Sequence, residues 1–197
     1  MKRKKKNRRR LLIKPDWKWI TMIFGTTVGI SATMSLVSGE LLSKGGMAVS
    51  FIVLLAIVMI GIVFDILGVA VTAAGEKSFH SMAAKKVPEA IVAIKLLRRA
   101  ERVSSFCNDV VGDICGVISG SASAVIAARV VLQMEPGFAQ IVQLLMSSLV
   151  AALTVGGKAF GKSIAMNNSE AIVHVAAKLI YGIQYLSKSL ANFFKKA

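Results

Sequence analysis

The most apolar stretch of this chain reads FIVLLAIVMIGIVF over residues 51–64 and contains no charged side chain. It belongs to an apolar segment from Met47 to Ala74, which exceeds the roughly 20 residues that a helix needs to cross a bilayer core of about 30 Å. Three other segments approach or exceed that length: Trp19 to Val37, Ser105 to Leu132 and Phe138 to Val155. We therefore predict an all-α integral membrane protein with about four transmembrane helices.

Composition and charge also favour a membrane protein. Of 197 residues, 55% are hydrophobic, and the mean hydropathy of +0.66 is above that of soluble domains with one packed core. The net charge of +15 comes from basic residues that flank the apolar segments and do not interleave with aromatic residues on one face. We expect the lipid bilayer as a partner, no specific nucleic acid, and a multi-pass protein of the cell membrane.

The distribution of Lys and Arg predicts the orientation. Ten of the 25 basic residues precede Trp19, seven lie between Glu76 and Arg102, and six follow Gly157. Only Lys44 and Arg129 fall in segments on the other side. The positive-inside rule then places both termini and the middle segment in the cytoplasm, with the loops 38–46 and 133–137 outside.

Two basic segments have amphipathic helical spacing. The segment from Lys77 to Val103 is interrupted at Pro88, which favours two short helices, because proline suits the first turn of a helix. The segment from Ser169 to Phe194 repeats the pattern. We expect both to be cytoplasmic juxtamembrane helices on the membrane surface, with solvated basic helices as the alternative.

Acidic residues inside the predicted spans need a physical reason. A charged residue at the centre of a membrane helix costs at least ~2.5 to 3.5 kcal/mol on insertion scales. Asp65 in the second span has a depth similar to that of Asp109 and Asp113 in the third, and Asn108 adjoins them. Their carboxylate and amide oxygens suit Mg²⁺, so one interpretation is a metal site of Asp65, Asn108, Asp109 and Asp113. The other is a structural contact in which an acid pairs with a basic neighbour or hydrogen-bonds between helices.

Three stretches carry a resemblance to a known family. FDILGVAVT spans Phe64 to Thr72, and LLRRAER spans Leu96 to Arg102, shortly before Cys107-Asn108-Asp109. GKSIAMNNSE spans Gly161 to Glu170 and leads into the second amphipathic segment. Together with the order of spans and amphipathic helices, they resemble the transmembrane domain of the CNNM/CorC family, and the last stretch is the most specific match.

The resemblance implies a function and a division of the chain. It implies a basic tail at 1–16, an additional transmembrane helix and outer loop at 17–46, and a CNNM/CorC-like domain with cytoplasmic belt helices at 47–197. It further implies Mg²⁺ or Co²⁺ transport, a homodimer, and a partner chain carrying the cytoplasmic regulatory domains that longer family members contain. Gly68 and Lys158 stand where the family has acidic residues, so the alternative is a non-transporting scaffold or accessory subunit that binds a partner protein or anionic lipid.

No enzyme motif is present in the sequence, and we predict that the protein is not an enzyme. Cys107 and Cys115 have no partner at metal-ligand spacing and are interpreted as small core residues. His80 and His174 lie in the amphipathic segments and are interpreted as surface residues.

Three glycines recur every four residues in the third predicted span: Gly112, Gly116 and Gly120. Small residues at this spacing let another helix approach closely. We expect this stripe to contact a helix of the same chain or of a second copy.

Overall fold

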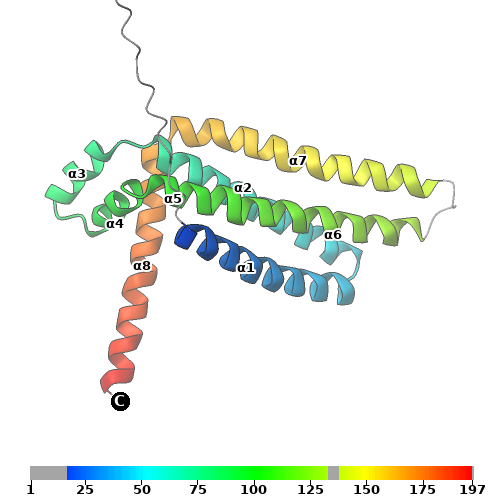
Figure 1. Ribbon diagram of the computed structural model, residues 1–197, viewed down its shortest axis with the longest axis horizontal. Helices are drawn as coiled ribbons and strands as arrows, with labels where there is room; N and C mark the ends of the chain where they lie inside the picture. Colours follow the sequence, from blue (N-terminus) through cyan, green and yellow to red (C-terminus); the bar gives the residue numbers. More distant parts are fainter. Residues whose placement is uncertain (1–16, 133–137, 197) are drawn as a thin grey trace, which may run out of the picture.

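The computed structural model describes residues 17–132 and 138–196, with side chains up to Ser187 in the last helix, and this part of the chain is helical without strands. Four helical stretches are long and apolar enough to cross a membrane: α1 (Trp17–Lys44), α2 (Met47–Ala73), a composite helix over Ala100–Val131, and α7 (Ala139–Asn167). They run alongside one another in Figure 1. The prediction of an all-α membrane protein with about four transmembrane helices is confirmed.

The first span is longer than the sequence predicted. The segment 38–46 was expected to be a loop, but α1 continues as far as Lys44, so that Gly45 and Gly46 alone connect it to α2. Glycine suits such a tight connection because it has no Cβ. The basic tail 1–16 and the expected loop 133–137 lie outside the described residues.

The composite helix contains a π-helical segment. It consists of α5 (Ala100–Ser105), the π-helix η1 (Phe106–Gly112) and α6 (Asp113–Val131). Its buried face includes Val110, Ile114 and Ile118, which pack in one cluster with Ile57 of α2. Cys107 and Cys115 are free thiols buried on the same composite helix, as the sequence predicted.

The second span, α2, lies at the centre of the bundle and contacts α1, α6 and α7. Close approach depends on glycines. A Cβ added to Gly61 would lie 2.9 Å from Cβ of Cys115 on α6. On α7, Gly157 and Gly161 lie against isoleucine side chains of α2 in the same way. The close contacts of α2 with α6 and α7 therefore depend on glycines of α2 and α7.

The predicted glycine stripe of the third span is only partly buried. Gly112 is buried, whereas a Cβ at Gly116 or Gly120 would meet nothing within 4 Å. A four-residue step turns an α-helix by about 40° beyond a full turn, so the stripe rotates out of the contact. The expectation of a helix partner within the chain is wrong for Gly116 and Gly120, and a contact with a second copy stays a prediction.

One end of the bundle, here called the basic end, carries α3 (Glu76–Ala84), α4 (Pro88–Leu97) and α8 (Ser169–Lys196), and α8 runs across the bundle axis (Figure 1). Pro88 is the first residue of α4, and the preceding turn contains Lys86 at a positive φ of 61°. The predicted division into two short helices is confirmed. These helices share a core with the ends of α2 and α7: Ala70, Val71, Phe79, Ala93, Leu97, Ala165, Val173 and Ala177.

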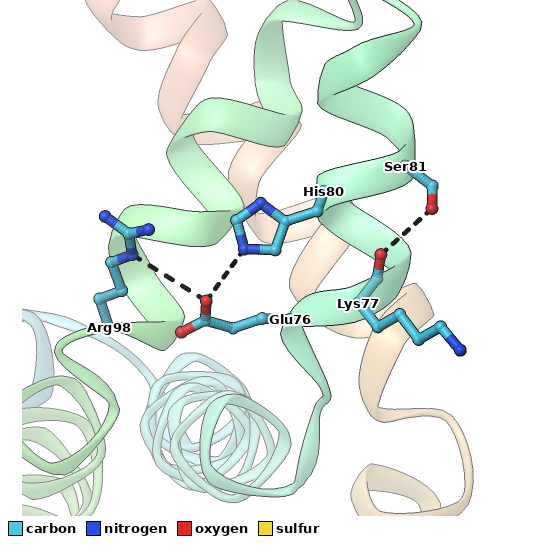
Figure 2. Close-up of polar contacts among 5 residues, drawn as sticks. All are labelled: Glu76, Lys77, His80, Ser81 and Arg98. Carbon is cyan, nitrogen blue, oxygen red and sulfur yellow. Dashed lines mark hydrogen bonds and ion pairs between the residues drawn. The ribbon is translucent and has the colours of Figure 1, made fainter.

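Polar contacts join the three helices of the basic end. Glu76 Oε2 lies 3.2 Å from His80 Nε2 and 3.9 Å from Arg98 Nε. This carboxylate therefore connects the start of α3 to the end of α4 (Figure 2). Ser78 donates a hydrogen bond of 2.7 Å to Glu170 at the start of α8. His80 is exposed, as predicted.

The second histidine differs from its prediction as a surface residue. His174 is half-buried, with Nε2 at 3.9 Å from Glu89 Oε1 of α4. With a protonated imidazole, this ion pair links α4 directly to α8.

Helix α8 has two apolar faces. Val173 and Ala177 are buried at the basic end, whereas Val175, Leu179 and Ile183 are exposed. The exposed residues recur every four positions and form a stripe beside the buried one. A helix that crosses the bundle axis with an exposed apolar stripe is typical of interfacial membrane helices.

At the opposite end, Arg129 of α6 caps α1. Its guanidinium donates hydrogen bonds to the carbonyl oxygens of Leu42 and, at 3.1 Å, of Gly45, and to Ser50 Oγ at 3.2 Å. The last carbonyls of a helix lack partners and carry partial negative charge. Arg129 therefore connects the end of α1, the start of α2 and the end of α6.

Candidate functional site

The most buried charge among the described residues belongs to Asp65 of α2, which is 5% exposed. Its Oδ1 lies 3.8 Å from Nζ of Lys158 on α7. Asp65 precedes the end of α2 by eight residues and Lys158 precedes the end of α7 by nine, so both lie about 12 to 14 Å inside the same end of the bundle. This arrangement matches the second interpretation of the sequence, in which an acidic residue within a span pairs with a basic neighbour.

Lys158 also reaches the composite helix. Its ammonium donates to the carbonyl oxygen of Gly112 at 3.5 Å. A Cβ on Gly112 would lie 3.2 Å from that ammonium, so a side chain there would crowd the lysine. Asp65, Lys158 and Gly112 thus join α2, α7 and η1 around one charged centre.

The charged centre is not fully satisfied. Oδ2 of Asp65 is buried and has no hydrogen-bond partner. The 3.8 Å separation of the ion pair is longer than a hydrogen bond, so the attraction is Coulombic.

Asn108 of η1 lies beside the same face of α2. Its Nδ2 donates to Ser104 Oγ at 3.2 Å, while its Oδ1 is buried without a partner. That oxygen lies directly over Gly68, where any Cβ would collide with it. Any larger residue at position 68 would therefore force the Asn108 side chain to move.

The other two predicted ligands lie elsewhere. Asp109 and Asp113 are exposed, and Asp109 Oδ2 accepts a hydrogen bond of 2.7 Å from Ser105. Asn108 and Asp109 are adjacent in η1 and therefore point in different directions about its axis, so Asn108 lies over Gly68 of α2 while Asp109 is exposed. Asp113, four residues later, follows Asp109 to the outside.

The predicted convergence of four ligands is therefore not observed. The structure brings Asp65 and Asn108 to one face of α2 and leaves Asp109 and Asp113 outside it. Within the described ranges 17–132 and 138–196, no three His, Cys, Asp or Glu side chains form a group that could hold a metal ion. Asn108 and Asp109 instead line an open polar crevice of about 540 Å³ with Thr72, Glu101, Ser104 and Ser105.

Lys158 is the site residue that the sequence did not predict as a ligand or partner. A signal was present, because a lysine in the middle of an apolar segment, at the depth of Asp65 from the same end, is a candidate counter-ion. Its pairing with Asp65 depends on how α2 and α7 are rotated about their axes, which the sequence pattern does not specify.

Comparison with known proteins finds no matching protein-family model, no matching curated protein and no matching solved structure. The resemblance to the CNNM/CorC family stays a prediction that rests on the residues quoted for it.

Proposed function

We propose that this protein is a membrane scaffold or accessory subunit that does not transport divalent cations. The observation that supports the proposal is the position of Lys158, whose ammonium lies against Asp65 Oδ1 and the Gly112 carbonyl oxygen. Carboxylate and carbonyl oxygens are the ligands that a small hard cation would use. The ammonium of Lys158 already lies beside these oxygens, in the place that such a cation would take.

The size of the electrostatic effect supports this reading. At about 4 Å and an effective dielectric constant of about 20, a divalent ion gains about 8 kcal/mol from one carboxylate and loses about 8 kcal/mol to one ammonium. Lys158 therefore cancels the attraction of Asp65 for Mg²⁺. The remaining carboxylates of the predicted set, Asp109 and Asp113, are exposed on another face.

The basic end supplies a surface for a scaffold role. In the orientation that the positive-inside rule favours, both termini and the helices α3, α4 and α8 are cytoplasmic. There they would meet the anionic leaflet or an acidic surface of a partner chain, for example one that carries regulatory domains. The exposed apolar faces of α1 and α7 suit lipid or a second copy in a homodimer.

One observation favours the competing function, transport of Mg²⁺ or Co²⁺. Oδ2 of Asp65 and Oδ1 of Asn108 are both buried and unpaired at the contact of α2 with η1. Two hard oxygens without donors are what a cation-binding state would employ. In that state the Lys158 side chain would have to move away, toward the end of α7.

The two functions are separated by thermal unfolding of the purified protein in detergent, with and without excess Mg²⁺ or Co²⁺. For a scaffold, we expect wild type to show no shift with either ion. Lys158→Met should destabilise the fold by about 3 to 5 kcal/mol, because it leaves a buried carboxylate unpaired. Asp65→Asn combined with Lys158→Met should recover most of that loss, since an amide needs no counter-ion.

Lys162→Met is the matched control, since Lys162 is an exposed lysine one turn further along α7. It should leave the melting temperature close to that of wild type. The proposal would be wrong if Mg²⁺ stabilised wild type by about 2.7 kcal/mol at a hundredfold excess over its dissociation constant and Asp65→Asn removed that effect.

A further inference from the structure

A crevice of about 550 Å³ lies between the start of α1 and the α5–η1 segment. These two segments meet at the basic end of the bundle (Figure 1). Its polar lining consists of Lys18, Arg99 and Arg102. Its apolar lining includes Met22 and Phe106. We propose that this crevice binds an anionic glycerophospholipid, with the phosphate among the three cations and an acyl chain along the apolar side.

The charges of the crevice carry the first part of the argument. The Arg102 guanidinium lies over the Trp19 ring, 5.0 Å from its centroid, which fixes this cation in place at the start of α1. Lys18 and Arg99 are exposed, and neither pairs with a carboxylate in the part of the chain that the structure describes. Three cations around one opening complement a phosphate group.

The depth of the apolar residues carries the second part. Met22 lies one turn further along α1 than Lys18, and Phe106 lies one turn further along the composite helix than Arg102, about 6 Å in each case. Both directions lead into the bundle and away from the basic end. A ligand that complements the crevice is therefore charged at its outer end and apolar at its inner end. A phospholipid has both parts, whereas a free phosphate has no apolar part.

A second crevice enlarges the cationic surface. It has a volume of about 560 Å³, lies between α4 and α8, and shares Arg99 and Val103 with the first. It adds Lys95, and also Arg98, which already pairs with Glu76. The headgroup beyond the phosphate can thus extend from Arg99 toward α8, in the plane of the membrane surface.

This inference goes beyond the proposed function and is independent of it. It requires a bilayer around the four spans and makes no use of Asp65 or Lys158. A protein that does transport Mg²⁺ would keep the same lipid site, so the failure of one proposal leaves the other intact.

The test is binding of phosphatidylglycerol or phosphatidylcholine to the full-length protein in neutral detergent, followed by native mass spectrometry and by the lipid-induced rise in melting temperature. Wild type should bind phosphatidylglycerol and be stabilised by it far more than by phosphatidylcholine. Lys18→Gln combined with Arg99→Gln should weaken phosphatidylglycerol binding about 30-fold. Lys77→Gln combined with Lys85→Gln removes the same charge from exposed positions of the α3 region and should leave binding close to wild type.

A second pair of variants tests the apolar side of the crevice. Met22→Ser should weaken binding of long-chain phosphatidylglycerol, whereas Phe24→Ser, an exposed residue of α1 that does not line the crevice, should not. Soluble glycerol phosphate and inorganic phosphate should not compete at concentrations where the lipid binds.

Four results would overturn the proposal. They are equal binding of the two lipids, equal loss in the crevice and control charge variants, equal loss in Met22→Ser and Phe24→Ser, and competition by inorganic phosphate as strong as that by the lipid. If the double charge variant does not fold, the single variants Lys18→Gln and Arg99→Gln are compared with Lys77→Gln in the same way.

Discussion

Replacing Gly61 by alanine tests the helix contact on which the bundle depends. The added Cβ would lie 2.9 Å from Cβ of Cys115, although carbon atoms in favourable contact are about 3.5 to 4.0 Å apart. Neither atom can rotate away, because each is fixed by its own backbone. Helices α2 and α6 would have to separate by several tenths of an ångström, against the packing of Ile57 with Ile114 and Ile118.

The expected magnitude follows from two opposing effects. Overpacking of this kind costs about 1 to 3 kcal/mol. Alanine in place of glycine within a helix contributes about 0.8 to 1 kcal/mol of stability. Gly116→Ala makes the same change on α6, where a Cβ meets nothing within 4 Å. This variant should therefore show the gain in helix propensity without the cost of overpacking. The difference between the two variants isolates the overpacking term, about 1 to 3 kcal/mol.

The assay is thermal unfolding of both variants and wild type in the same detergent. For a protein of this size, 1 kcal/mol corresponds to about 2 to 4 °C, so Gly61→Ala should melt at least about 2 °C below Gly116→Ala. Equal melting temperatures for these two variants would refute the close contact of α2 with α6. A loss of stability in both Gly116→Ala and Gly120→Ala would instead reveal a contact with a second copy.

Two further changes have effects that can be read from the structure. Arg129→Met removes the donors to the carbonyl oxygens at the end of α1 and should lower the unfolding free energy by about 2 to 3 kcal/mol. The control is Arg98→Met, at an exposed arginine of the basic end, which should change the unfolding free energy by less than about 1 kcal/mol. Equal effects of the two substitutions would contradict the capping role. Phe79→Ala removes the largest fully buried side chain of the basic end and should lower the unfolding free energy by about 3 to 5 kcal/mol. Amide hydrogen exchange in α3 and α4 should become faster. Unchanged exchange there would contradict a shared core.

Much of the fold could be predicted from local sequence. The apolar run at residues 51–64 was sufficient for the central span, because crossing a bilayer requires only length and hydropathy. Pro88 marked the start of α4, since its missing N–H and fixed φ are tolerated only in a first turn. The spacing of apolar residues after Ser169 predicted α8 and its amphipathic character for the same local reason.

The candidate site was only partly predictable. Asp65 was identified from its depth alone, because an acid in an apolar span is costly wherever it points. Asp109 and Asp113 were assigned to the same pocket by their depth, but a shared pocket also requires that the side chains point toward it. The composite helix points Asn108 at Gly68 and leaves both acids exposed. Matched depth is necessary for a shared site, and it is not sufficient.

The sequence by itself determined the helical segments apart from the end of α1, which of them are apolar enough for a membrane, and which end of the bundle is basic. Only the tertiary structure decided that Lys158 meets Asp65, that Arg129 caps α1, and that Gly61 and Gly68, rather than Gly116 and Gly120, lie at close contacts. The physical reason is that hydropathy and helix propensity depend on neighbours along the chain. Contacts between helices depend on the rotation of each helix about its axis, which is set by side chains far apart in the sequence.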